Sequence, residues 1–254
     1  MRILSIDSSL GTQVAVVDTA ETAGLPGTCS VQVLSQAEQA DTRRHAESLG
    51  QMLSEALSAP GVADRPLDAV VAATGPAPFT GLRAGLVTAR VVGRTRGIPV
   101  HGVSSLDAVA RLALDEIGAR QGEKDPVVLV ATDARRREVY AALFRANGPD
   151  DVTRLTEISV CPPAQVAECI AVQAPEQGSG AAAIDTVAGS GAALYPELVG
   201  AASCHEVLAP VSGDVLTQVR IALARLGRGE ELGTQPLYLR HADVQMPAAR
   251  KRVR

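Results

Sequence analysis

Aromatic side chains are scarce in this sequence. Its 254 residues include no tryptophan, two phenylalanines and three tyrosines, and its 46% hydrophobic content comes mostly from alanine, valine and leucine. Proteins that stack nucleic-acid bases on aromatic platforms need many such side chains, so the composition argues against that class. The formal net charge of −4 gives no overall basic footprint for a polyanion either.

Metal-site and disulfide patterns are also missing. The four cysteines (Cys29, Cys161, Cys169 and Cys204) form no CxxC pair and have no histidine pattern around them. This spacing predicts reduced thiols. The apolar run before Asp7 is too short for a signal peptide, and no apolar segment approaches the roughly 18 residues of a membrane span. We therefore expect a soluble, cytoplasmic chain with no membrane association.

The segment from Val70 to Val100 has the clearest local pattern. A short apolar run predicts a buried strand, and Gly75-Pro76-Ala77-Pro78 interrupts regular structure after it. Thr80 is the expected N-cap of a following helix, which should end near Gly97. The pattern is strand, turn and helix.

Small residues recur along one face of this predicted helix. Gly81, Gly85, Ala89 and Gly93 are spaced by four positions. Each interior glycine costs about 1 kcal/mol relative to alanine, so the face must make a close contact. That contact is either with the chain's own sheet or with another helix.

The opening pattern of the chain occurs twice. Asp7 follows a buried strand and precedes a turn and a second strand, and Asp133 stands in the same position about halfway along the sequence. This repetition predicts an α/β protein with two related lobes. We expect the first lobe at 1–106, the second at 107–212, and at 213–254 a C-terminal helix that returns toward the first lobe, followed by a basic tail.

A second strand-to-glycine-to-helix junction occurs at Gly189-Ser190-Gly191. Such a junction can bind phosphate through backbone N–H groups, although two glycines also occur in ordinary tight turns. The sequence has neither GxxxxGK[ST] nor GxGxxG. The candidate nucleotide-binding residues are Asp7, Ser8, Ser9, Asp133, Gly189, Ser190 and Gly191.

Several segments together resemble a known family. They are ILSIDSS and VAVVD near the start, RRHAESL, TGPAPFTGLRAG, VVLVATDARRREVYAALF, and PLYLRHAD near the end. With these motifs the chain resembles the TsaB (YeaZ) proteins of bacterial tRNA threonylcarbamoyladenosine (t6A) synthesis. The resemblance covers most of the chain and is weakest between Val152 and Gly180.

The resemblance implies a two-lobed actin-like, ribonuclease H-like fold with duplicated lobes. It also implies a non-catalytic subunit that forms a heterodimer with the TsaD threonylcarbamoyltransferase, with TsaE joining the larger complex and tRNA contacted indirectly. Alone, such a chain is expected to form a homodimer. No cofactor is required under this interpretation. The alternative is a nucleotide-binding ATPase or phosphotransferase of the same fold, which would bind ATP or ADP.

One departure from the TsaD pattern bears on catalysis. Ser105 and Val109 stand where the resemblance places the two metal-binding histidines of TsaD. Neither side chain can replace imidazole as a ligand. We therefore expect no catalytic residues, no metal site and no enzyme activity of the TsaD kind.

The resemblance also suggests a partner interface. In the family this interface is formed by first-lobe helices, which correspond here to Thr42–Leu57 and Thr80–Arg96. The expected interface residues are His45, Leu49, Leu53, Gly81, Arg83, Gly85, Ala89 and Gly93.

Overall fold

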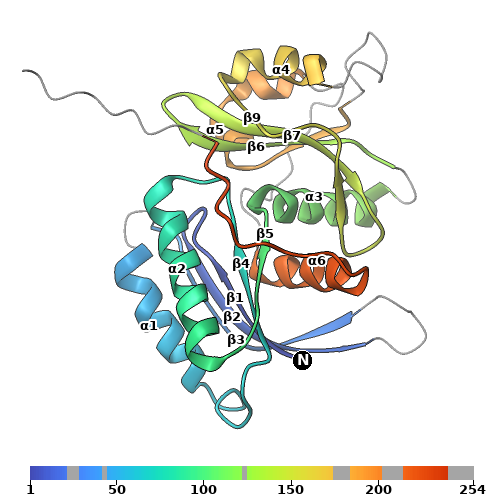
Figure 1. Ribbon diagram of the computed structural model, residues 1–254. Coiled ribbons are helices and arrows are strands. Elements are labelled where there is room, and N and C mark those ends of the chain that lie inside the picture. Colours follow the sequence, from blue (N-terminus) through green and yellow to red (C-terminus); the bar gives the residue numbers. More distant parts are fainter. Residues whose placement is uncertain (22–28, 42–44, 122–124, 174–183, 202–213, 240–254) are drawn as a thin grey trace, which may run out of the picture.

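The computed structural model describes residues 1–21, 29–41, 45–121, 125–173, 184–201 and 214–239. Each of its two lobes is a β-sheet with helices on both faces (Figure 1). This arrangement confirms the predicted α/β fold with duplicated lobes. The described helices include none that is long and apolar enough to cross a membrane.

The first sheet has five strands in the order β3-β2-β1-β4-β5. β1 pairs antiparallel with β2 and parallel with β4, which in turn pairs parallel with β5. Side chains of β1 alternate between the two faces, so Leu4 and Ile6 lie in one core cluster and Ile3 lies in the other. The strands are β1 (Arg2–Asp7), β2 (Thr12–Glu21), β3 (Cys29–Gln39), β4 (Ala69–Ala73) and β5 (Val100–Val103).

The second sheet repeats this topology. β6 pairs antiparallel with β7 and parallel with β10, as β1 pairs with β2 and β4. Two short strands, β8 and β9, both pair antiparallel with β7. The strands are β6 (Val128–Arg135), β7 (Glu138–Ala146), β8 (Val152–Arg154), β9 (Ser159–Cys161) and β10 (Thr186–Ala188).

Helices connect the strands and cover the faces of both sheets. The main ones are α1 (His45–Ser58), α2 (Phe79–Arg96), α3 (Ser105–Gln121), α4 (Val166–Gln173), α5 (Ser190–Leu194) and α6 (Val215–Gly227), with short 3₁₀ helices at Pro163–Gln165 and Pro196–Ala201. Gly97 ends α2 with φ 66°, as predicted. The N-cap of α2 is Pro78 rather than Thr80, and no side chain caps this end.

The helices that cover each sheet are not all adjacent in sequence to its strands. α1 and α2 cover one face of the first sheet, and α6 covers the other face through Val215, Val219 and Ala222. α3 follows the first lobe in sequence but packs on the second sheet, through Leu106, Val109 and other apolar residues. α4 and α5 cover the opposite face of that sheet.

After α6 the chain crosses back over the first lobe. We call residues 229–239 the C-terminal strap. It passes along β5, where Gly102 N–H donates to the carbonyl of Leu232 (3.2 Å), and Leu237 N–H then donates to the carbonyl of Thr74 (2.9 Å). The strap therefore covers the edge of the first sheet, an edge that would otherwise offer unpaired backbone groups.

Candidate functional site

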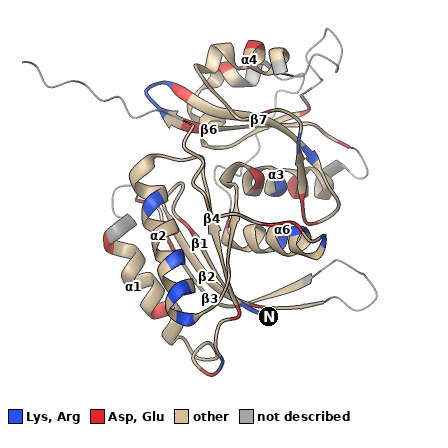
Figure 2. Cartoon of the chain, viewed as in Figure 1, with Lys and Arg blue, Asp and Glu red and all other residues tan. Residues whose placement is uncertain are grey.

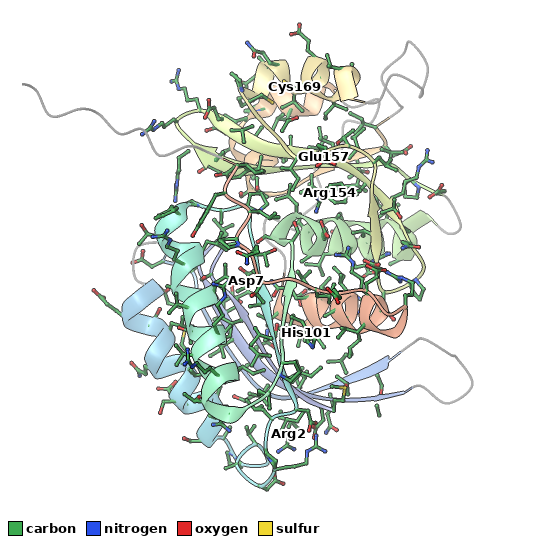
Figure 3. The ribbon with its side chains drawn as sticks, viewed as in Figure 1. Arg2, Asp7, His101, Arg154, Glu157 and Cys169 are labelled. Carbon is green, nitrogen blue, oxygen red and sulfur yellow. The ribbon has the colours of Figure 1, made fainter. Side chains whose placement is uncertain are left out.

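Asp7 lies at the carboxyl end of β1, where the two lobes meet (Figure 3). Its side chain is buried, and both carboxylate oxygens accept hydrogen bonds. Ser9 N–H donates to Oδ1 (2.7 Å), and Gln218 Nε2 from α6 donates to Oδ2 (2.5 Å). Burial raises the pKa of the Asp7 carboxyl, and these hydrogen bonds only partly oppose the shift. The group is enclosed by its own lobe.

Ser8 binds the backbone of α2. Its hydroxyl donates to the carbonyl of Gly81 (2.8 Å) and accepts from Gly85 N–H (3.1 Å). A Cβ atom on Gly85 would lie 2.3 Å from Ser8 Oγ, and one on Gly93 would lie 2.3 Å from Val100 Cγ2. The glycines of α2 therefore allow the helix to approach the first sheet closely.

This packing corrects part of the expected partner interface. Gly81, Gly85, Ala89 and Gly93 are all buried against the chain's own strands and turn. The spacing of the small residues predicted close contact either with the chain's own sheet or with another helix. In the structure the contact is with the chain's own sheet. These four residues do not lie on the outer surface of the first lobe.

The other expected interface residues are spread over two helices. Arg83 is exposed on α2, Leu49 is buried and Leu53 is half-buried on α1. His45 begins α1, and its side chain is outside the described part of the chain. The interface itself stays a prediction.

Asp133 lies near the end of β6, the equivalent strand of the second lobe, and is also held within its lobe. Its N–H donates to Ser190 Oγ (3.1 Å), while its carboxylate accepts from Arg135 N–H (2.9 Å) and pairs with the Arg135 guanidinium (3.3 Å). Asp7 and Asp133 therefore occupy matching positions, each engaged by neighbours from its own half of the molecule.

The junction at Gly189-Ser190-Gly191 has a packing role. Cβ atoms on Gly189 and Gly191 would lie 2.4 and 2.9 Å from the carbonyl oxygen of Ala131. The glycines thus seat α5, only five residues long, on β6. Close packing against Ala131 is therefore enough to explain the two glycines of this turn, and no bound phosphate is needed to explain them.

An exposed stripe runs along the outer face of α2. Its members alternate between apolar and basic side chains: Phe79, Arg83, Val87, Arg90, Val91 and Arg94. α2 has four arginines and no acidic residue, and Figure 2 shows the arginines in a row along this helix. We call these six residues the α2 stripe. Exposed apolar side chains among polar ones are typical of protein interfaces.

The strap completes one end of this stripe. The guanidinium of Arg83 lies 3.7 Å from the centre of the Phe79 ring, and Arg83 Nε donates to the hydroxyl of Tyr238 (2.8 Å). Arg90 Nε donates to Thr234 Oγ1 (3.2 Å). Sequence reasoning missed Tyr238 because it lies 155 positions from Arg83.

Gln218 was also missed, although the sequence carried a signal for it. It lies between Val215 and Val219 on the apolar face of α6, where an amide needs a partner. That partner is Asp7. A polar residue on an apolar helix face is therefore the feature that could have predicted this contact.

Residues 32–212 match the protein family described as TsaD, tRNA N6-adenosine threonylcarbamoyltransferase. A protein of Rhizobium meliloti (strain 1021) described by that same name is 34% identical over 123 residues, which cover 44% of this chain and 34% of the relative.

Two further similarities cover more of the chain. An uncharacterised protein of Mycobacterium tuberculosis (strain ATCC 25618 / H37Rv) is 42% identical over 143 residues, 54% of this chain and 63% of the relative. The chain therefore spans less than two thirds of the curated relatives it matches. The solved structure titled YeaZ from Pseudomonas aeruginosa superposes with a TM-score of 0.67 at 23% identity, over 94% of this chain and 99% of that one, which shows a shared fold.

Proposed function

The chain belongs to the TsaD family, and from this membership we propose that it is a non-catalytic subunit of the tRNA t6A37 synthesis complex, of the TsaB (YeaZ) type. In this role it binds the TsaD threonylcarbamoyltransferase and organises it for catalysis. TsaE joins the larger assembly, and tRNA is contacted through the complex. The subunit requires no cofactor of its own, works in the cytoplasm and forms a homodimer when alone.

The identity of two residues on α3 carries this proposal. The family resemblance places the metal-binding histidines of TsaD at Ser105 and Val109. Val109 is buried in the apolar core of the second lobe, beside Val130 and Phe144, and a valine offers no ligand atom. These residues do not fit a metal ion, so the proposal assigns no chemical step to them.

The α2 stripe is the surface we assign to TsaD. The interior packing of the small residues leaves this outer face as the part of α2 that a partner can reach. Val87 and Val91 are 56% and 53% exposed, and Arg83 and Arg90 flank them. Burying such apolar side chains supplies affinity, while the arginines select an acidic counterpart.

Size-exclusion chromatography with light scattering tests the proposal. The chain is run alone, with TsaD of the same organism, and with TsaD, TsaE and ATP. A stable complex containing one copy of each of this chain and TsaD is the expected result. Absence of any complex under all three conditions would overturn the proposed function.

Two matched variants locate the surface. Val91→Glu places a charge within the α2 stripe and is expected to weaken TsaD binding at least tenfold. Val172→Glu introduces the same charge on α4 of the second lobe, at a valine that is 81% exposed, and should leave binding unchanged. Equal binding by both variants would contradict the assignment of the α2 stripe.

A further inference from the structure

α6 presents two chemically different faces. Its apolar face packs on the first sheet, together with Ile3, Val17 and Val71. Its other face carries Arg220 and Arg225, and Arg228 caps its end. All three arginines reach acidic residues that belong to the second half of the fold.

These contacts form one connected set of charges. Arg225 pairs with Asp107 and with Asp151, each at 2.9 Å, and Arg220 pairs with Asp115 (2.7 Å) and Asp150 (2.8 Å). The remaining pairs are Arg154–Asp107 (2.7 Å), Arg111–Asp115 (3.0 Å), Arg228–Asp151 and Arg228–Glu230 (2.8 Å). We call this set the interlobe charge network.

The acidic members are anchored in the second lobe. Asp107 and Asp115 lie on α3, which packs on the second sheet, and Asp150 and Asp151 lie in the loop between β7 and β8. Arg111 fixes this loop by donating to the carbonyls of Gly148 and Asp151, both at 3.1 Å. Figure 1 shows α3 and α6 facing each other between the two sheets.

The central charges are shielded from solvent. The side chains of Asp151 and Asp107 are 1% and 4% exposed, and that of Arg225 is 16% exposed. A buried ion pair adds little net stability compared with apolar packing, but separating its partners leaves charges without compensation. Movement of one lobe relative to the other would separate these pairs. It would disturb the hydrophobic clusters less because, among the described residues, only the cluster around α6 reaches across, through Ala108 of α3.

We infer that the interlobe charge network holds the two lobes in one fixed arrangement, so that this chain does not open and close around a ligand. Two-lobed proteins that bind ligands between their lobes commonly close by hinge motion. Here the end of the chain that completes the first lobe is tied to the second by three arginines, Arg220, Arg225 and Arg228, which pair with four aspartates. The chain acts as a rigid body, independently of whether TsaD is its partner.

Distance measurement between the lobes tests the inference. Spin labels are introduced as genetically encoded amino acids at Ser54 on α1 and Glu168 on α4, both exposed, so the native cysteines stay unchanged. The labelled full chain is mixed with a large excess of unlabelled chain, so that distances between two copies do not contribute. Pulsed electron paramagnetic resonance should then give one narrow distance distribution that magnesium ATP does not alter. A second distance, or a shift with magnesium ATP, would overturn the inference whether or not the chain binds TsaD.

A charge variant assigns the effect to the network. Arg225→Met keeps much of the side-chain volume but removes the charge between Asp107 and Asp151, and should broaden the distance distribution at least twofold. Glu230→Gln removes an outer charge that is 46% exposed and should leave the distribution unchanged. A folded Arg225→Met protein with the narrow wild-type distribution would show that the charges do not fix the lobes. If this variant does not fold, the wild-type measurement with magnesium ATP decides alone.

Discussion

Gln218 and Asp7 are 211 positions apart in the sequence, yet the Gln218 amide donates a 2.5 Å hydrogen bond to the Asp7 carboxylate inside the first lobe. The amide oxygen of Gln218 is buried and has no hydrogen-bond partner among the described residues. Burial opposes ionisation of the Asp7 carboxyl. The Gln218 amide that contacts it has an oxygen to which no described group donates.

This relationship predicts that Asp7→Asn stabilises the protein at pH 7. The asparagine oxygen can still accept from Ser9 N–H. If the Gln218 side-chain amide turns over, the asparagine NH2 can donate to its oxygen in place of the bond that Gln218 Nε2 now makes. The number of hydrogen bonds is then unchanged, and the variant no longer buries a charge, which we expect to be worth at least about 1 kcal/mol. Urea unfolding of both proteins at pH 7 measures the difference in the free energy of unfolding.

The pH dependence provides a second readout of the Asp7 prediction. Because burial raises the pKa of Asp7 in the folded state, its contribution to stability is fully present below the unfolded pKa of about 3.9 and is lost as pH rises through the folded pKa. The advantage of Asp7→Asn should therefore grow with pH. Asp18→Asn is a control whose effect on stability has the opposite sign. The hydrogen bond from Arg2 lowers the pKa of Asp18, so losing this carboxylate should cost stability above the unfolded pKa of about 3.9. A stability curve for Asp7→Asn parallel to that of the wild type would contradict the prediction.

Gly85→Ala should destabilise the first lobe by about 3 kcal/mol, because the added Cβ overlaps Ser8 Oγ and disrupts both hydrogen bonds of that hydroxyl. Gly50→Ala is the matched change on α1, where a Cβ meets nothing within 4 Å. It should stabilise the protein by about 1 kcal/mol. Thermal unfolding of both variants measures this contrast, and equal effects would show that α2 does not pack as described.

Arg137→Gly should stabilise the protein by about 0.5–1 kcal/mol. Arg136 and Arg137 form the two-residue turn between β6 and β7, with φ of 56° and 60°. Such turns favour Asn-Gly because both residues have positive φ. Arg137→Ala removes the charge but keeps the unfavourable backbone and should stay within about 0.5 kcal/mol of wild type. Guanidinium unfolding would refute the strain argument if alanine stabilised as much as glycine.

Asp214→Ala should cost about 1 kcal/mol. Asp214 Oδ1 accepts from the N–H groups of Leu216 and Thr217, both at 2.7 Å, and so caps the start of α6. Asp214→Asn keeps an acceptor at this position and should retain most of the stability. Circular dichroism during thermal unfolding tests both variants, and equal losses would show that the charge matters rather than the cap.

The sequence carried enough information for the repeated architecture. Apolar runs, turn residues and the matching positions of Asp7 and Asp133 are local features, so they predicted the strands and the duplication. The end of α2 at Gly97 was predictable for the same reason. The start at Pro78 was not, because the Pro-rich turn itself sets the backbone direction there.

The candidate site depended on contacts that local patterns do not reveal. The small residues of α2 indicated a close neighbour, but only the fold shows that the neighbour is Ser8 and not another helix. Similarly, Arg111 and Asp115 have helical i,i+4 spacing, whereas the Arg225–Asp107 pair joins residues 118 positions apart. Long-range pairs of this kind require the topology first.

The position of α6 in the chain has a consequence for biosynthesis. One face of the first sheet, including Ile3 and Val71, is covered by Val215, Val219 and Ala222. Ribosomes deliver the amino end first, and domains generally fold in that order. Here the first lobe emerges early with one apolar face of its sheet not yet covered by α6, and α6 can cover that face only after Val215–Gly227 has left the exit tunnel. Because exposed apolar surface on a partly folded chain promotes aggregation, we expect the nascent first lobe to depend on chaperones while the second is synthesised.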